Sequence, residues 1–234
     1  MKKRLRIALT VLSTAALLGT GAISSAQAET VTSSQADQLS QFWTAHDVPQ
    51  ATQRVLLAKI ESGKVIDALK SDHVAVSEVT ADRGGLRETT STYKDGSIGI
   101  ASVELPAVVN GVAVAADGPV TGVSRCSLST YSGVASYSNC LVGYTATGKS
   151  FNFNANFTLV TGASNDYIRD KGTSGTVSCV TYCTTPAFQT WKANEDSGGK
   201  AYLTYATEWN LAGTTSSTLF LTLVVGGNTY SAHA

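Results

Sequence analysis

Four cysteines present the sharpest chemical choice in this chain, because thiolates bind metals, attack carbonyls or pair as disulfides. Cys126 and Cys140 have 13 residues between them, and Cys179 and Cys183 have three. Neither spacing is that of a paired C-x-x-C zinc site, and an even count in an exported chain favours disulfides. Three pairings are possible. We predict Cys126 with Cys140 and Cys179 with Cys183, no metal site and no free thiol.

The two predicted bonds make different demands on the backbone. The first would tie two strands together across "SLSTYSGVASYSN", and closing such a loop contributes roughly 3 kcal/mol in the chain-entropy model. The second, in "CVTYC", requires a turn, because an extended strand would hold the two Cα atoms about 13 Å apart, beyond disulfide reach.

Catalytic motifs are scarce. The sequence contains no G-x-S-x-G elbow, no H-E-x-x-H and no glycine-rich phosphate loop between a strand and a helix. The three histidines, His46, His73 and His233, are expected to be surface or capping residues. A two-carboxylate glycosidase stays open, because its acids can lie far apart in sequence. Nothing in the spacing selects a pair among the candidates Asp166, Asp170, Glu195, Asp196 and Glu208.

Candidate binding residues are tyrosines and asparagines. Eight of the nine tyrosines lie beyond residue 120, and exposed aromatic rings beside Asn and Ser stack on sugars or contact proteins. We single out Tyr131, Tyr137 and Tyr144 in this region, and the row Asn152, Asn154 and Asn156 as a polar recognition face. The alternative is a solvated outer sheet face.

Period-two alternation predicts the elements that carry these residues. In "FNFNANFTLV" the apolar positions 151 to 159 share one face, and "AYLTYATEW" alternates similarly. "TLFLTLVV" is apolar on both faces, which predicts a central strand buried on both sides, and "NTYSAHA" is expected to close the sheet. Residues 120–234 therefore predict an antiparallel β-sandwich or jelly-roll-like domain.

The preceding segments predict smaller elements. Residues 29–73 read as a helical hairpin, with Trp43 in its seam, Asp47 as the cap of the second helix, Pro49 in that helix's first turn and Gly63 ending it. Residues 74–119 predict a β-hairpin region and linker, with a turn at Lys94–Ser97, and 105–119 as a connector that could hide a strand. The fold class expected is mainly β with a small N-terminal helical module (α+β).

The N-terminus predicts the compartment. Four basic residues precede a short apolar stretch and the A-x-A triplet Ala26–Ala28, which is typical of a signal peptide over residues 1–28. The whole chain has 17 basic and 17 acidic residues. Removing four basic ones with the signal leaves 13 against 17, a net charge of about −4, which disfavours nucleic acid as a partner. We expect a secreted chain with no stable membrane insertion and no cofactor.

A resemblance adds to this interpretation. The segments "FNFNANFTLVTGASNDYI", "YLTYATEWNLAG" and "TYKDGSIGIASVE" resemble those of uncharacterised secreted actinobacterial proteins with a helical N-terminal module and a disulfide-containing β-domain. The resemblance implies export from a Gram-positive bacterium and no particular activity.

The function expected is that of a non-catalytic binding protein at or outside the cell envelope. Its ligand would be a glycan or an extracellular protein. Two alternatives remain, namely a polysaccharide-acting enzyme with two carboxylates and a secreted inhibitor or competition factor presenting residues 127–139.

Overall fold

The computed structural model describes residues 32–109, 112–114, 126–147, 149–162, 165–179, 182–210 and 217–234. It is mainly β with two helices near the N-terminus, and its sheets are antiparallel, as the sequence predicted. The expected signal peptide (1–28) and the expected boundary between residues 119 and 120 lie outside the described residues.

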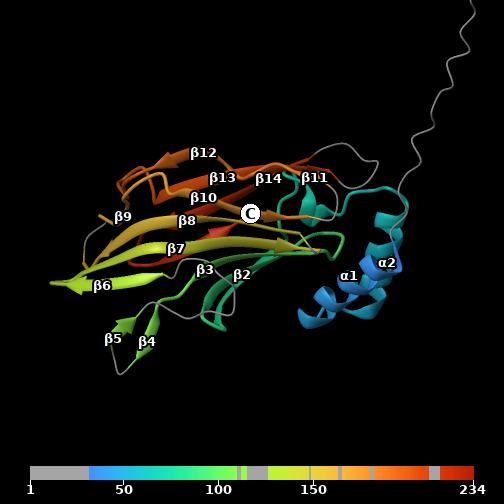
Figure 1. The fold of residues 1–234 in the computed structure, drawn as a ribbon, viewed down its shortest axis with the longest axis horizontal. Coiled ribbons are helices and arrows are strands. Elements are labelled where there is room, and N and C mark those ends of the chain that lie inside the picture. The colour runs from blue at the N-terminus through green and yellow to red at the C-terminus, as the bar shows by residue number, and fades with distance from the viewer. Residues whose placement is uncertain are drawn as a thin grey trace, which may run out of the picture.

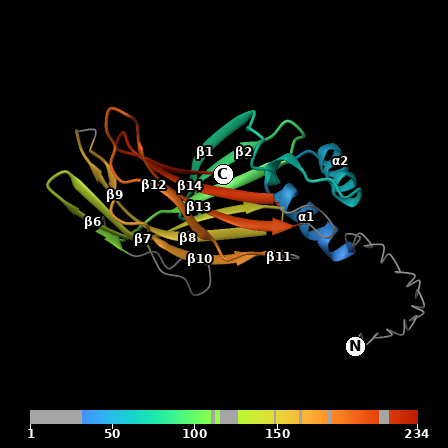
Figure 2. The same cartoon turned by 90° about the horizontal axis from the view of Figure 1, so that it is seen from above.

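The helical module lies at one end of the β-structure (Figures 1 and 2). It comprises α1 (Ser33–Ala45), α2 (Gln50–Glu61) and the 3₁₀ turn η1 (Asp67–Leu69). A capping box begins α1, because Thr32 and Gln35 each accept a hydrogen bond from the other's backbone N–H. Trp43 and Leu56 are fully buried between the helices and the rest of the core, which confirms Trp43 as a packing residue.

Of two sequence predictions about the ends of α2, one is wrong and one is confirmed. The prediction that Asp47 caps α2 is wrong: the N-cap is Pro49, with no side-chain cap. Asp47 instead occupies the interhelical turn with a φ of 58°, a conformation that short polar residues tolerate. Gly63 has a φ of 74° just beyond α2, as predicted for a residue that ends a helix in the left-handed region.

The first sheet has eight strands, some from the middle of the chain and some from its second half. Its main path is β1-β2-β3-β7-β8-β10, with β6 paired to β7 and β9 to β8. The strand β3 therefore pairs directly with β7, across the segment expected to be a linker. The eight strands are β1 (Ser77–Arg83), β2 (Leu86–Thr92), β3 (Ile98–Glu104), β6 (Ser127–Tyr131), β7 (Val134–Ala146), β8 (Lys149–Val160), β9 (Tyr167–Ile168) and β10 (Thr173–Ser178).

The second sheet has five strands and packs on the first (Figure 1). Its order is β11-β13-β14-β15, with β12 also paired to β13. A separate two-stranded ribbon, β4 with β5, lies within the segment expected as a connector. These elements are β4 (Ala107–Val109), β5 (Val112–Val114), β11 (Tyr182–Cys183), β12 (Ala187–Lys192), β13 (Ala201–Asn210), β14 (Ser217–Val225) and β15 (Tyr230–His233).

Alternation decides which side chains fill the space between the sheets. Positions 151, 153, 155 and 157 of β8 are buried, as the pattern predicted, and the Phe153 ring stacks on Tyr205 of the opposite sheet at 4.5 Å between centroids. The prediction for β14 was wrong in part. This strand is central, but its outer face is only half-buried and Phe220 is 41% exposed, because no further layer of the described elements covers that face.

Candidate functional site

The two disulfides connect the predicted partners. Cys126 and Cys140 are bonded with their Cα atoms 4.0 Å apart, and Cys179 and Cys183 with theirs 6.3 Å apart. The first bond joins the start of the β6–β7 hairpin to the bulge in β7 that follows Tyr137. Both bonds fit an oxidising compartment, and the described residues hold no free thiol.

The three singled-out tyrosines lie in three different environments. Tyr131 is 82% exposed at the tip of the β6–β7 hairpin. Tyr137 is half-buried, stacked on Phe157 at 4.6 Å and edge-on to Tyr230 at 5.1 Å, and burial raises its pKa. Tyr144 is buried and donates its hydroxyl to the carbonyl oxygen of Ala68 at 2.7 Å, so it links the sandwich to the helical module. The structure therefore does not gather these tyrosines into one surface.

The asparagine row on β8 contacts neighbouring strands and loops. The Asn152 amide donates to the Thr176 hydroxyl and accepts from the Thr176 N–H, both at 2.9 Å, which binds β8 to β10. Asn156 accepts from the backbone N–H of Asn139 at 2.7 Å and donates to Asp170 Oδ2 at 2.9 Å. Asn154 is half-buried between them on the same face of β8. A binding role for these residues remains a prediction.

Four of the five candidate carboxylates hold loops together. Asp166 accepts from the N–H groups of Val160 and Asn228, both at 2.7 Å, and Glu195 accepts from the N–H of Gly227 at 2.9 Å. Asp170 accepts from the N–H of Gly172, and Asp196 from the N–H of Gly198 and from Lys192. The fifth, Glu208, is exposed on β13. Asp166 and Glu195 thus meet at one turn, between β14 and β15, where their oxygens accept backbone hydrogen bonds.

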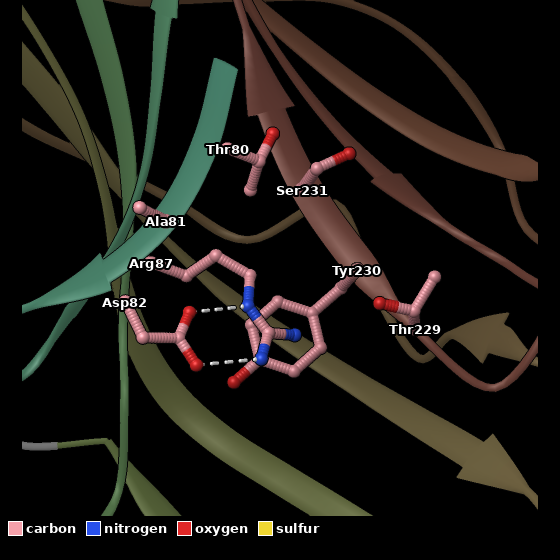
Figure 3. A pocket seen from close by; sticks show the side chains of 7 residues that line it. All are labelled: Thr80, Ala81, Asp82, Arg87, Thr229, Tyr230 and Ser231. Atoms are coloured by element: carbon pink, nitrogen blue, oxygen red, sulfur yellow. Dashed lines mark hydrogen bonds and ion pairs between the residues drawn. The ribbon is translucent and has the colours of Figure 1, made fainter.

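A cleft lies where the β1–β2 hairpin passes over β15 (Figure 3). It has a volume of about 540 Å³, within the range of small-ligand sites. The polar face of the β1–β2 hairpin forms one wall and the β14–β15 turn with β15 forms the other. The lining residues are Thr80, Ala81, Asp82, Arg87, Thr229, Tyr230 and Ser231.

Arg87 is the organising side chain of this cleft. Its Nε and Nη2 donate to the two oxygens of Asp82 at 2.8 and 3.0 Å, and its guanidinium carbon lies 4.8 Å from the centre of the Tyr230 ring. The bond with Asp82 raises the pKa of Arg87 and lowers the pKa of Asp82. Burial raises the pKa of the Tyr230 hydroxyl, and the neighbouring Tyr137 adds to that shift. Both ions of the pair therefore stay charged across the physiological range.

Hydrogen-bonding capacity remains open around the pair. Arg87 Nη1 has no hydrogen-bond partner among the described residues. The Thr80 hydroxyl lies 3.1 Å from that of Thr89, and the Ser231 hydroxyl lies 2.8 Å from Nε2 of His233. Because a hydroxyl donates once and accepts twice, each retains capacity for a ligand.

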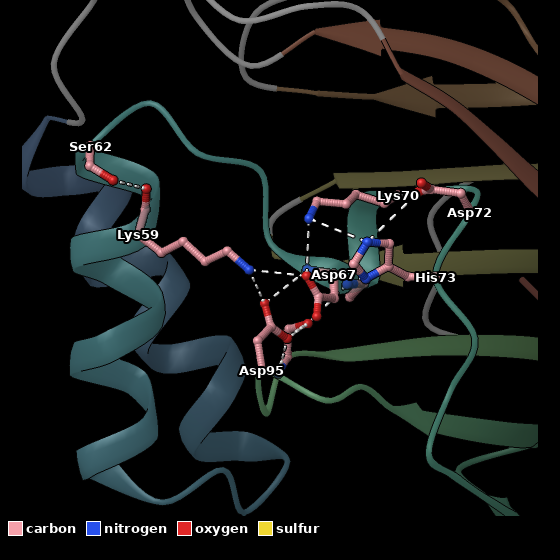
Figure 4. A network of polar contacts seen from close by, with 9 residues as sticks. Lys59, Ser62, Asp67, Lys70, Asp72, His73 and Asp95 are labelled. Atoms are coloured by element: carbon pink, nitrogen blue, oxygen red, sulfur yellow. Dashed lines mark hydrogen bonds and ion pairs between the residues drawn. The ribbon is translucent and has the colours of Figure 1, made fainter.

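A second polar cluster connects the helical module to the β2–β3 turn (Figure 4). Lys59 of α2 reaches Asp67 at 3.0 Å and Asp95 at 2.7 Å, and Lys70 reaches Asp67 at 3.1 Å. His73 Nδ1 lies 3.3 Å from the same Asp67 oxygen. The contacts of the Asp67 and Asp95 carboxylates are made with groups of the protein itself, so we assign this cluster a structural role.

Neither Arg87 nor Tyr230 is among the residues predicted from the sequence. The available signal was the alternation of "LRETTST" in β2, whose polar positions 87, 89 and 91 lie on the face that points inward. A polar inner face indicates that something other than an ordinary core covers it, but only the packing shows that this is β15.

Among the described residues, no three His, Cys, Asp or Glu side chains gather as a metal site requires. No helix in that part of the chain has both the length and the apolar character needed to span a bilayer. No family model matches the chain, and neither a curated protein nor a solved structure matches it significantly.

Proposed function

We propose that the mature chain is an extracellular, non-catalytic binding protein that takes a glycan into the cleft around Arg87. The signal-like N-terminus, the two disulfides and the resemblance to secreted actinobacterial proteins support export. The carboxylates considered for catalysis support binding over turnover, because four of the five accept hydrogen bonds from backbone N–H groups of the protein itself.

The observation that carries the ligand class is the chemistry of the cleft wall. A planar guanidinium whose Nη1 has no partner among the described residues, a paired carboxylate and four hydroxyl-bearing side chains line a space of about 540 Å³. Such side chains match the alternating donors and acceptors of sugar hydroxyls. The Arg87–Asp82 pair leaves the cleft without net charge at its centre, which favours an uncharged glycan over an anionic one.

Binding of the mature protein to a panel of soluble cell-envelope oligosaccharides, measured by calorimetry, tests the proposal. Replacing Arg87 with Lys keeps the charge but removes the planar donor fork, and we expect affinity to fall at least about tenfold. The matched control is Arg83→Lys, because Arg83 is an exposed residue of the same β1–β2 hairpin that does not line the cleft. Equal affinity of the two variants, or no binding by wild type, would contradict the proposal. Turnover of any glycan would favour the two-carboxylate enzyme.

A further inference from the structure

The strand β1 is an open edge of the first sheet. It begins the strand order, its only partner among the described strands is β2, and six of its seven residues are exposed. Three of the large apolar side chains that are exposed in the described residues fall in the stretch 74–79. Val74, Val76 and Val79 are 87%, 65% and 64% exposed. Proteins ordinarily protect such edges with charge, proline or a covering segment.

The two acidic side chains of β1 do not protect this edge. Glu78 is directed inward, where Oε1 accepts from the Ser91 hydroxyl at 3.0 Å and Oε2 lies 3.4 Å from Nδ1 of His233. Asp82 is held by Arg87 in the cleft. The opposite face of the strand presents the uncharged Ser77, Val79 and Ala81, and its one charged residue, Arg83, lies at the end of the strand beside the turn.

The turn between β1 and β2 determines which backbone groups are free. Gly84 and Gly85 have φ values of 55° and 79° and form a two-residue turn, so the flanking residues Arg83 and Leu86 make a hydrogen-bonded pair. Hydrogen-bonded pairs alternate along an antiparallel ladder. The residues at 77, 79, 81 and 83 therefore bond to β2, and the N–H and C=O groups of Glu78, Thr80 and Asp82 point to the open edge.

We propose that two copies of this chain form a two-fold dimer by antiparallel pairing of β1 with β1, with the dyad at Val79. This register places Glu78 opposite Thr80 of the second copy, where their free backbone groups can bond, and it places the two Val79 side chains against each other in a non-hydrogen-bonded pair. A dyad at Thr80 would set Glu78 against Asp82 of the second copy and oppose like charges, so the sequence of β1 favours the first register.

A second copy is the occupant that this edge fits, because the same strand supplies both complementary halves, as an isologous interface requires. The pairing would continue the first sheet across the dyad and shield the exposed valines. Since β1 also lines the cleft, two clefts would flank the dyad and allow bivalent binding. The dimer does not depend on the ligand proposed for the cleft.

Crosslinking through a new cysteine tests the register. In a non-hydrogen-bonded pair the Cβ atoms lie within disulfide reach, so Val79→Cys is expected to yield mostly covalent dimer under mild oxidation, with the bond located by peptide mass spectrometry. Val55→Cys is the matched control, because Val55 is 63% exposed on α2, away from β1. Crosslinking of Val79→Cys no greater than that of Val55→Cys would overturn the proposal.

The oligomeric state provides an independent readout. Sedimentation or light scattering of the mature wild-type protein should give twice the protomer mass at high micromolar concentration. Val79→Lys should halve that mass, and Val55→Lys should leave it unchanged. A wild-type protein that stays monomeric at that concentration would refute the dimer, even if the cleft binds glycans.

Discussion

Lys149, the first residue of β8, places an amine in the interior. The residue is 5% exposed, its Nζ has no hydrogen-bond partner among the described residues, and Nζ lies 3.1 Å from the centre of the Trp209 ring. Burial lowers the pKa of Lys149 from 10.5 to about 7. The ring face favours the charged amine and works in the opposite direction. An uncompensated buried cation reduces the free energy of unfolding.

Replacing Lys149 with Met should therefore stabilise the protein. From pH 7 to about 10 the unfolded chain binds the proton that the folded amine has lost, so wild-type stability should rise with pH in this window and level off below it. Allowing for the cation–π contact, we expect Lys149→Met to gain about 2 kcal/mol at pH 7 and to remove that part of the pH dependence. Urea unfolding across the window measures this, and Lys94→Met, at an exposed lysine, should change little.

Close packing also explains why position 175 is a glycine. A Cβ on Gly175 would lie 1.9 Å from Oδ1 of Asn152, the atom that accepts from the Thr176 N–H. The amide of Asn152 therefore requires a glycine on the neighbouring strand. The sequence showed an alternating polar residue at 152, but the partner strand that uses it became evident only from the pairing of β10 with β8.

The helical module is attached to the sandwich through the β2–β3 turn. Burial of the Asp95 carboxylate would raise its pKa, but hydrogen bonds from Lys59, Ser97 and the backbone N–H of Asp67 outweigh burial and lower the pKa to about 2. The Ser97 hydroxyl also accepts from the N–H of Ala68 at 2.9 Å. The side chains of the β2–β3 turn thus bind the 3₁₀ segment that follows α2.

Asp95→Asn should weaken this attachment. The depressed pKa means that the carboxylate contributes stability above about pH 4 and loses it as the pH falls towards 2. Allowing for the solvent that reaches the carboxylate, we expect a loss of about 1–2 kcal/mol at pH 7 and a shallower decline in acid. Thermal unfolding of the variant and of Asp37→Asn, at an exposed position of α1, between pH 2 and 7 provides the comparison. Equal acid sensitivity of wild type and Asp95→Asn would contradict the assignment.

At the scale of the whole molecule, the part of the chain that the structure describes shares one continuous hydrophobic core. Buried residues of the helices, such as Trp43 and Leu56, belong to the same cluster as those of both sheets. The Tyr144 hydroxyl, bonded to the carbonyl of Ala68, crosses the same boundary. Shared burial of this kind couples the stability of the two parts.

Unfolding should therefore be a single transition. Circular dichroism of the helices and fluorescence of the tryptophans are expected to change together on heating. Trp43→Ala should lower the midpoint of the whole transition, at a cost of about 3–5 kcal/mol, without creating a second one. An early, separate loss of helix signal in wild type would show that the module folds independently.

The sequence alone was enough to predict the structural features that depend on residues close together in the chain. Alternation of apolar and polar residues predicted the buried face of β8, and the segment Lys94–Ser97 predicted the β2–β3 turn. The even number of cysteines and their spacing predicted both disulfide pairs. These features are local, because side-chain direction in a strand and closure of a short loop follow from a few consecutive residues.

Only the tertiary structure decided the cleft and the status of the candidate residues. Arg87 meets Tyr230 because the β1–β2 hairpin passes over β15, and Asp166 and Glu195 are occupied by a turn that comes later in the chain. Such contacts depend on which strands become neighbours and how two twisted sheets overlap. Alternation within a strand reports which side chains share a face, but the partner that covers that face is set by packing between segments distant in sequence.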